Sequence, residues 1–140
     1  MPAACGARRP RYPHPMNAKA FNATCRRLPA TSHVVQWGGA DVWKVGGKVF
    51  ALAHWDNEAG DGSAGAITFK VSEVAFEILK DQPGLRPAPY LASRGLKWIQ
   101  HYASPGLSDA ELADYLARSH ALVAGGLSRK KRRELGLEPA

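Results

Sequence analysis

The dipeptide Gly46-Gly47 is the feature that most constrains the fold, because it separates two short segments that are each typical of a β-strand. Glycine adopts positive φ angles readily, and a two-residue hairpin turn requires them. Residues 41–45 and 48–53 flank the dipeptide and are rich in valine and aromatic side chains. The sequence therefore predicts a β-hairpin within residues 41–55.

This hairpin has a predicted register. With Gly46-Gly47 as the turn, Trp43 lies opposite Phe50 and Lys44 opposite Val49. Side chains alternate between the two faces of a strand, so one face collects the large apolar residues. We expect the core to contact this face, which carries Trp43, Val45, Phe50 and Leu52.

Helices and further strands are expected on both sides of the hairpin. The predicted helices cover about residues 18–28, with Asn17 as N-cap, then 72–80, and then 108–124. The other strands cover about residues 31–37, 67–71 and 96–102, with an extended proline-rich segment at 85–92, and Thr68 and Lys70 are expected to face outward. Consecutive strands joined by short loops indicate an antiparallel sheet, so the predicted fold is α+β, with two layers and the helices on one face.

The charge of the chain is concentrated at its two ends. The formal net charge is +7, but residues 16–127 hold eleven basic and ten acidic side chains, a net +1. Residues 1–15 are rich in proline and arginine without periodicity, which predicts a disordered N-terminal extension. Residues 16–127 form the predicted domain, and 128–140 a basic C-terminal helix or tail that can bind phosphate or can simply be solvated.

No pattern of catalytic or metal-ligating residues is visible. The five histidines lack metal-ligand spacing, although His54 and His101 both lie on predicted strands and can meet in space; partly exposed strand histidines are the favoured interpretation. No serine lies in a nucleophile elbow, and no glycine-rich stretch matches a nucleotide-binding fingerprint. We therefore predict no enzyme activity, no cofactor and no metal.

The same sequence favours a cytoplasmic protein that does not enter a membrane. It contains no apolar run near the ~18 residues of a membrane helix and no secretory h-region. Cys5 and Cys25 form no CxxC motif, and Cys25 is expected on the apolar face of a helix. These features favour the reducing cytosol. They leave the oligomeric state open.

Cations and aromatic residues alternate in one segment of the chain, at Arg86, Tyr90, Arg94, Lys97 and Trp98. Cations suit phosphate contacts, and aromatic rings suit stacking on bases or sugars. The alternative is that Trp98 belongs to the core and the cations are ordinary surface charges, because most tryptophans are largely buried.

Several stretches together resemble the small bacterial MmcQ/YjbR family, over about residues 16–137. The resemblance rests on CRRLPA at residues 25–30, KVGGKVFA at 44–51, FKV at 69–71, RPAPYL at 86–91, Trp98, LSDAEL at 107–112 and SHALV at 119–123. It implies a CyaY-like fold, shared with the frataxins, and a double-wing DNA-binding motif whose wings are β-hairpins. The chain differs from the family at His120, where tyrosine is usual, in its longer loop at 56–65 and in its additional N-terminal tail.

Mapped onto this chain, the resemblance implies wings formed by the hairpin with Lys44 and Lys48, by Lys70, and by residues 86–98. The frataxin kinship raises iron binding as a rival, but residues 17–28 hold three cations and no acid, whereas hard cations need carboxylate oxygens. We therefore hypothesise a non-enzymatic protein that binds DNA with low sequence specificity. The alternative is a protein-interaction or small-ligand-binding module that uses the sheet face. The predicted nucleic-acid-binding residues are Lys44, Lys48, Lys70, Arg86, Tyr90, Arg94, Lys97 and Trp98.

Overall fold

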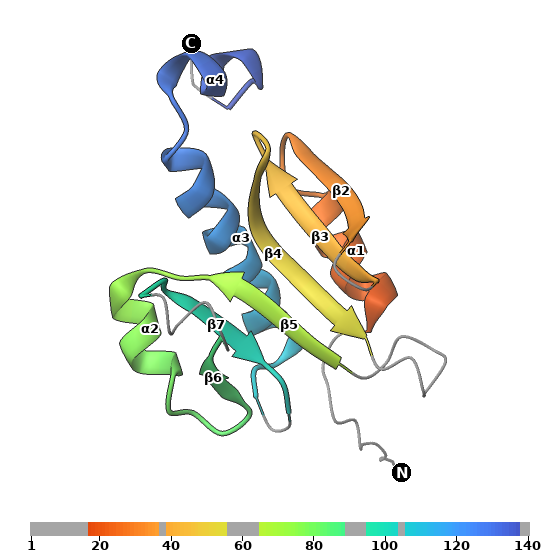
Figure 1. Ribbon diagram of the computed structural model, residues 1–140, viewed down its shortest axis with the longest axis vertical. Coiled ribbons are helices and arrows are strands. Elements are labelled where there is room, and N and C mark those ends of the chain that lie inside the picture. The colour runs from red at the N-terminus through yellow and green to blue at the C-terminus, as the bar shows by residue number, and fades with distance from the viewer. Residues whose placement is uncertain (1–16, 37–38, 56–64, 89–94, 104–105, 138–140) are drawn as a thin grey trace.

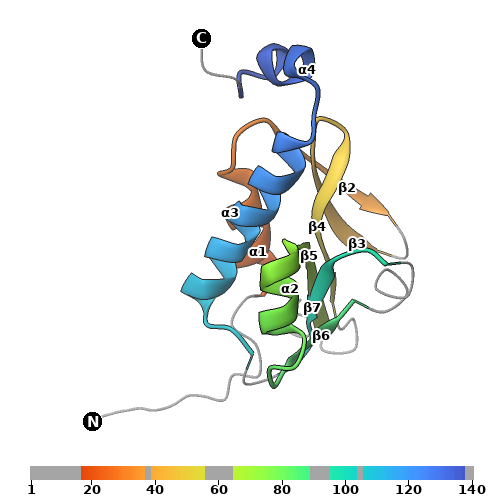
Figure 2. The ribbon, with the colours of Figure 1, turned by 90° about the vertical axis from the view of Figure 1, so that its left-hand side faces the viewer.

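The computed structural model of the 140-residue chain describes residues 17–36, 39–55, 65–88, 95–103 and 106–137. These residues form one antiparallel sheet with helices packed against one of its faces (Figures 1 and 2). The predicted α+β class, with an antiparallel sheet and helices on one face, is thereby confirmed. The final helix, α4, lies beyond the end of the sheet (Figure 1).

Ten elements follow one another within the described residues. They are α1 (Ala18–Arg26), β2 (Thr31–Gln36), β3 (Ala40–Val45), β4 (Lys48–Trp55), β5 (Gly65–Lys70), α2 (Glu73–Leu79), β6 (Leu85–Pro87), β7 (Trp98–His101), α3 (Asp109–Gly125) and α4 (Arg129–Glu134). The six strands lie in the order β2-β3-β4-β5-β7-β6, and every neighbouring pair is antiparallel. The chain therefore crosses the sheet from the edge strand β2 to β5, and then adds β6 as the other edge and β7 between β5 and β6.

The helices begin where the capping residues of the sequence place them. The Asn17 side chain accepts a hydrogen bond from the Ala20 amide at 2.9 Å, and Ser72 caps α2 in the same way. Ser108 and Glu111 form a reciprocal capping box at the start of α3. Each cap satisfies amide groups that have no partner within the first turn, which fixes the residue at which the helix starts.

The hairpin forms at Gly46-Gly47, but its register changes along its length. Lys44 pairs with Val49 as predicted, whereas Trp43 pairs with Ala51 and not with Phe50. A β-bulge therefore places one additional residue in β4. Such a bulge reverses the alternation of side chains beyond it.

The bulge has a consequence for the core. Phe50 and Ala51 both contact the cluster beneath the helices, whereas Leu52 turns to the opposite face beside Val42. The prediction that Leu52 shares the core face of Trp43 is therefore wrong. Its apolar side chain instead joins a second, smaller cluster, in which Ala40, Val42 and Leu52 are buried and Val34 and Val49 are partly buried.

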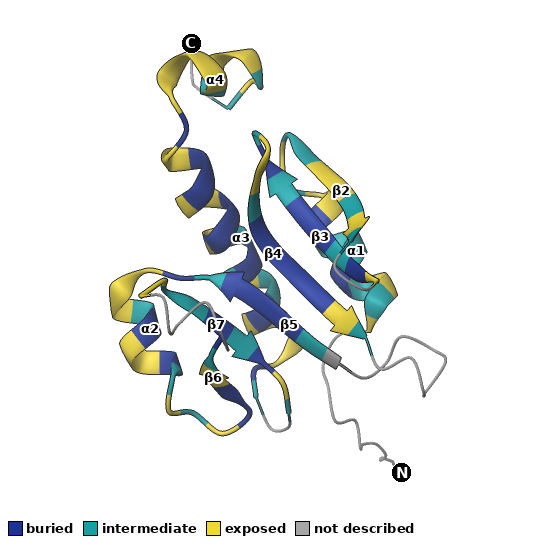
Figure 3. Cartoon of the chain, in the orientation of Figure 1, coloured by how far each residue is buried: buried dark blue, intermediate teal, exposed yellow. Residues whose placement is uncertain are grey.

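The main core lies between the sheet and the helices. Figure 3 shows buried residues along β3, β4 and β5, whereas α2 and α4 are largely exposed. In α2 only Phe76 and Leu79 are buried, and Val74 and Ile78 face solvent. Thr68 lies on the helix-free side of the sheet, but it is 4% exposed, so the prediction that it faces outward into solvent is wrong.

Two buried polar residues of α3 fasten this helix to the rest of the domain. The Ser119 hydroxyl lies 2.6 Å from the Lys70 carbonyl oxygen at the end of β5. His120 Nε2 lies 2.7 Å from the Pro29 carbonyl oxygen, and the His120 ring packs edge-on against Phe50. Buried polar groups with partners of this kind define one packing arrangement. In this chain, His120 therefore has a structural position inside the domain.

Candidate nucleic-acid interface

The sheet has one face on which no described helix lies, and we call it the open face. Ala40, Val42, Leu52 and Thr68 on this face are nevertheless buried, so only part of it is accessible. The strand registers determine which side chains occupy it. Asp41 is the only acidic residue in the described strands, and it points to the opposite face with Trp43 and Ala53. Among the described strand residues, the open face thus carries three cations and no carboxylate. Its residues are Ser32, Val34, Gln36, Ala40, Val42, Lys44, Val49, Leu52, His54, Ala66, Thr68, Lys70, Arg86, Trp98 and Gln100.

A cation and an aromatic ring meet at the β6–β7 edge of this face. Arg86 Nε donates a hydrogen bond to Gln100 Oε1 at 2.7 Å, across the two paired strands. The Arg86 guanidinium carbon also lies 4.3 Å from the centre of the Tyr102 ring, and Tyr102 is 40% exposed. The hydrogen bond and the cation–π contact hold the guanidinium in a defined position while Arg86 stays exposed.

Trp98 and Lys70 occupy the next positions inward on the same face. They are direct partners in the pairing of β7 with β5, and both are partly exposed. Trp98 is therefore neither a fully buried core residue nor a freely exposed one. Its neighbour Ile99 is fully buried on the helix side, so the backbone beneath Trp98 is firmly held.

The structure gathers four of the eight predicted binding residues on the open face, namely Lys44, Lys70, Arg86 and Trp98. Lys48 lies beside the turn, opposite Val45, and is exposed. Lys97 is on the helix side, where its Nζ lies 4.7 Å from the centre of the Phe76 ring. Tyr90 and Arg94 lie outside the described residues.

His54 and His101 do not meet. β5 separates their strands, with Ala66 opposite His54 and Ile67 opposite His101. Ala66 and Ile67 are consecutive residues of one strand, so the two histidines point to opposite faces. His101 is buried and His54 is exposed, and they cannot act on one ligand.

Sequence reasoning missed a polar cluster centred on Asp41. Its carboxylate accepts hydrogen bonds from Trp55 Nε1 at 2.7 Å and Asn22 Nδ2 at 3.2 Å, and it lies 2.7 Å from His33 Nε2. Asn22 in turn accepts a hydrogen bond from Trp43 Nε1 at 2.8 Å. The cluster thereby ties α1 to β2, β3 and β4, and the isolated acid within a predicted strand was the only available signal for it.

The charge state of Asp41 follows from these contacts. Burial opposes the charged form, but the hydrogen bonds from His33, Trp55 and Asn22 outweigh this and lower the pKa of the Asp41 carboxyl below its ordinary value. Burial, with a smaller contribution from the nearby Asp41 charge, raises the pKa of the Cys25 thiol far above its ordinary value. Cys25 is therefore a protonated core residue and not a reactive thiolate.

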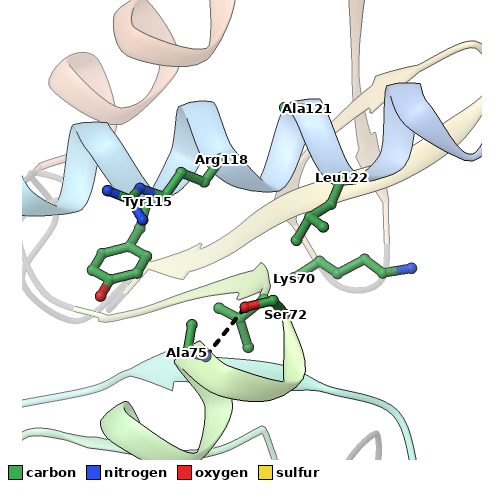
Figure 4. Close-up of a pocket in the computed structure, with 8 residues that line it drawn as sticks. Lys70, Ser72, Ala75, Tyr115, Arg118, Ala121 and Leu122 are labelled. Atoms are coloured by element: carbon green, nitrogen blue, oxygen red, sulfur yellow. Dashed lines mark hydrogen bonds between the residues drawn. The ribbon is translucent and has the colours of Figure 1, made fainter.

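A cleft of 340 Å³ opens on the helix side of the molecule, between α3 and the segment that enters α2 (Figure 4). Two of its polar side chains already have partners, because Ser72 caps α2 and Arg118 Nε binds Asp114 Oδ2 at 2.7 Å. The cleft is mostly apolar, and it shares only Lys70, at the end of β5, with the open face. Its lining residues are Lys70, Val71, Ser72, Ala75, Tyr115, Arg118, Ala121 and Leu122.

The described residues meet the requirements of neither a metal centre nor a membrane-spanning helix. Within the described ranges, no group of three or more histidine, cysteine, aspartate or glutamate side chains is arranged to hold a metal ion. In the same part of the chain, no helix combines the length and apolar character that crossing a membrane requires.

Comparisons with known proteins agree with this architecture. A model of the YjbR family matches residues 26–122, which is more than half of the chain. The crystal structure of Deinococcus radiodurans protein DR2400, which carries a DUF419 domain, has a TM-score of 0.71 at 22% sequence identity, over 89% of this chain and 92% of that chain. At this identity the likeness concerns the fold alone. A comparison with curated proteins found no match.

Proposed function

The chain belongs to the YjbR family, and on that premise we propose that it is a non-enzymatic protein that binds DNA with low sequence specificity. The observation that carries the proposal is the charge pattern of the open face, on which the described strands place Lys44, Lys70 and Arg86 and no carboxylate. Phosphate groups supply most of the affinity of such proteins for DNA, and a carboxylate among the cations would repel them.

The aromatic residues support the same proposal. Trp98 lies beside Lys70, and Tyr102 lies beneath Arg86 on the adjacent edge. A cation next to an exposed ring can contact a phosphate while the ring lies against a sugar or base. The β3–β4 hairpin adds Lys44 and Lys48 next to its turn, and it is the candidate wing of the proposed double-wing mode.

Low sequence specificity follows from the scarcity of groups that read base edges. Gln100 is an amide side chain beside one of these cations, and its oxygen already accepts a hydrogen bond from Arg86. Bidentate readout of adenine by an amide needs both of its polar atoms. The cations on this face therefore contribute mainly phosphate contacts, which carry no direct sequence information.

The proposal assigns no catalysis. Cys25 is buried with a raised pKa, and His54 and His101 lie on opposite faces. The rival proposal, a protein or small ligand bound on the sheet face, predicts binding that salt does not weaken. The salt dependence of binding therefore separates the two candidates.

The first prediction concerns the three cations of the open face. Replacing Lys44, Lys70 and Arg86 together by glutamine should weaken DNA binding and reduce the slope of log affinity against log salt. The expected reduction is about 0.9 for each phosphate that the protein no longer neutralises. The measurement is fluorescence anisotropy with a labelled duplex, across a salt series from ~50 to ~300 mM.

A charge-matched control removes three cations from the helical layer instead, with Lys19, Arg27 and Lys80 replaced by glutamine. This variant has the same net charge as the first, but the cations that it lacks lie away from the open face. It should therefore retain most of the affinity for DNA and most of the slope of log affinity against log salt. Equal losses in the two variants would show that net charge alone, and not the open face, drives binding. Absence of binding by the unmodified protein at low salt would refute the proposed function.

A further inference from the structure

Helix α4 carries the densest positive charge of the described chain. Its sequence is RKKRRE, and Ser128 caps it through a hydrogen bond from the Lys131 amide at 3.1 Å. Arg129, Lys130, Lys131 and Arg133 are all exposed. No apolar residue occurs within the helix itself. Its cations are thus displayed to solvent at the end of the domain.

This helix is attached to the domain core on both sides. Leu127, directly before it, is buried, and Leu135 and Leu137, directly after it, pack against the main core. Arg132 Nη1 donates hydrogen bonds to the carbonyl oxygens of Leu127 at 2.8 Å and Gly125 at 3.0 Å. Arg132 therefore holds α4 against the end of α3, and the four exposed cations keep a defined place relative to the sheet.

The β3–β4 hairpin turn lies against the start of α4. A Cβ atom on Gly46 would lie 2.6 Å from Leu127 Cδ1 and 2.9 Å from Leu127 Cδ2, so the turn backbone packs directly on this leucine. Figure 1 shows α4 beyond the end of the β3–β4 hairpin. Lys44 and Lys48 flank that turn. The hairpin lysines and the α4 cations thus occupy the same end of the molecule.

We propose that α4 and the tip of the β3–β4 hairpin form one polybasic surface that binds the phosphate backbone of nucleic acid. This inference rests on the proposed function and deepens it, because it adds a second group of phosphate contacts at the edge of the open face. The surface comprises Lys44, Lys48, Arg129, Lys130, Lys131 and Arg133.

The chemistry of α4 favours nucleic acid over an anionic membrane. A helix that lies on a membrane inserts an apolar face between the lipids. The leucines that flank α4 are instead used in packing on the core, and α4 offers only charged side chains. A surface of this kind gains its affinity by releasing counterions from a polyanion, as phosphate-binding cations do on nucleic acid.

The test replaces Arg129, Lys130, Lys131 and Arg133 by glutamine and retains Arg132 and the flanking leucines, so that the helix stays docked. If half of these cations contact phosphates, the slope of log affinity against log salt should fall by about two, and affinity for a labelled duplex at ~0.1 M salt should fall about 100-fold. The matched control replaces Lys19, Arg27, Lys80 and Arg118 by glutamine, all on the helical layer, and should change both quantities far less.

The outcomes separate this inference from the proposed function. Unchanged slope and affinity in the α4 variant, together with weaker binding in the open-face variant, would overturn the inference and leave the proposed function intact. A larger fall in the slope of log affinity against log salt for the α4 variant than for its control supports the inference. No duplex binding by the unmodified protein would overturn both. Binding to vesicles that contain phosphatidylserine, without binding to duplex, would assign α4 to a membrane and overturn it as well.

Discussion

Replacing Asp41 by asparagine is expected to lower the free energy of unfolding by about 3 kcal/mol. The carboxylate accepts from Trp55 and Asn22 and lies against His33, with its side chain 13% exposed. An asparagine at this position offers one acceptor oxygen and turns an NH₂ group toward a donor. At least one partly buried donor then loses its partner, which costs more than the average hydrogen bond is worth. Urea denaturation of both proteins measures the difference.

The control for this prediction is Asp114→Asn. Asp114 is exposed on α3 and forms an ion pair with Arg118 four residues later, which is worth little on a surface. The free energy of unfolding of that variant should lie within about 0.5 kcal/mol of the parent's. If Asp41→Asn lowers the free energy of unfolding no more than Asp114→Asn does, the cluster around Asp41 does not hold α1 to the sheet.

Asp41 is also expected to make the stability of the folded protein sensitive to acid. Because the folded-state pKa of Asp41 is lowered, its contribution to stability is present above the unfolded-state pKa of about 3.9 and is lost as the pH falls through the folded-state value. Between about pH 5 and pH 3 the parent should therefore lose more stability than Asp41→Asn, whose side chain does not titrate. Parallel stability curves over this range would exclude Asp41 as the source of the acid sensitivity.

The second large effect is expected for Gly84→Ala, just before β6. Gly84 has a φ of +88°, and a Cβ there would collide with the Ala103 carbonyl oxygen and lie 2.7 Å from the Gly106 nitrogen. Both obstacles are backbone atoms, and the Gly84 carbonyl also accepts hydrogen bonds from the amides of Tyr102 and Ala103. The backbone therefore cannot move aside without losing those hydrogen bonds. We expect the free energy of unfolding to fall by about 3 kcal/mol or more.

Gly47→Ala is the matched control for this substitution. Gly47 has a similar φ of +82°, but nothing lies within 4 Å of its Cβ position. Only the strain of a positive φ at a residue with a side chain applies here, so the free energy of unfolding should fall by about 1 kcal/mol. Thermal unfolding of the two variants separates the contribution of strain from that of the collision. Equal losses would show that the backbone around Ala103 adjusts.

Prediction from the sequence succeeded where the deciding interaction is local. Asn17, Ser72 and Ser108 each cap a helix through an amide three residues away, and Gly46-Gly47 makes its turn within four residues. Such contacts are set by neighbours along the chain. The fold class follows from the same information, because short loops between strands allow only antiparallel pairing.

Prediction failed where the deciding contact spans the chain. The bulge at Phe50 arises because both Phe50 and Ala51 pack beneath the helices, with Phe50 against His120 of α3. The alternation of side chains along the strand does not predict this packing, so it assigns Leu52 to the wrong face. Lys97 and Trp98 are adjacent in the sequence, yet the sheet turns one toward Phe76 and leaves the other on the open face.

The sequence by itself therefore determined the elements of this protein, their capping residues and the antiparallel sheet, since each depends on residues a few positions apart. Only the tertiary structure decided which cations share a face, that Asp41 is turned away from them into a hydrogen-bonded cluster, and that α4 is docked beside the hairpin turn. The physical reason is that strand register and helix docking are set by packing between segments distant in the chain, and a shift of one residue moves a side chain to the other face.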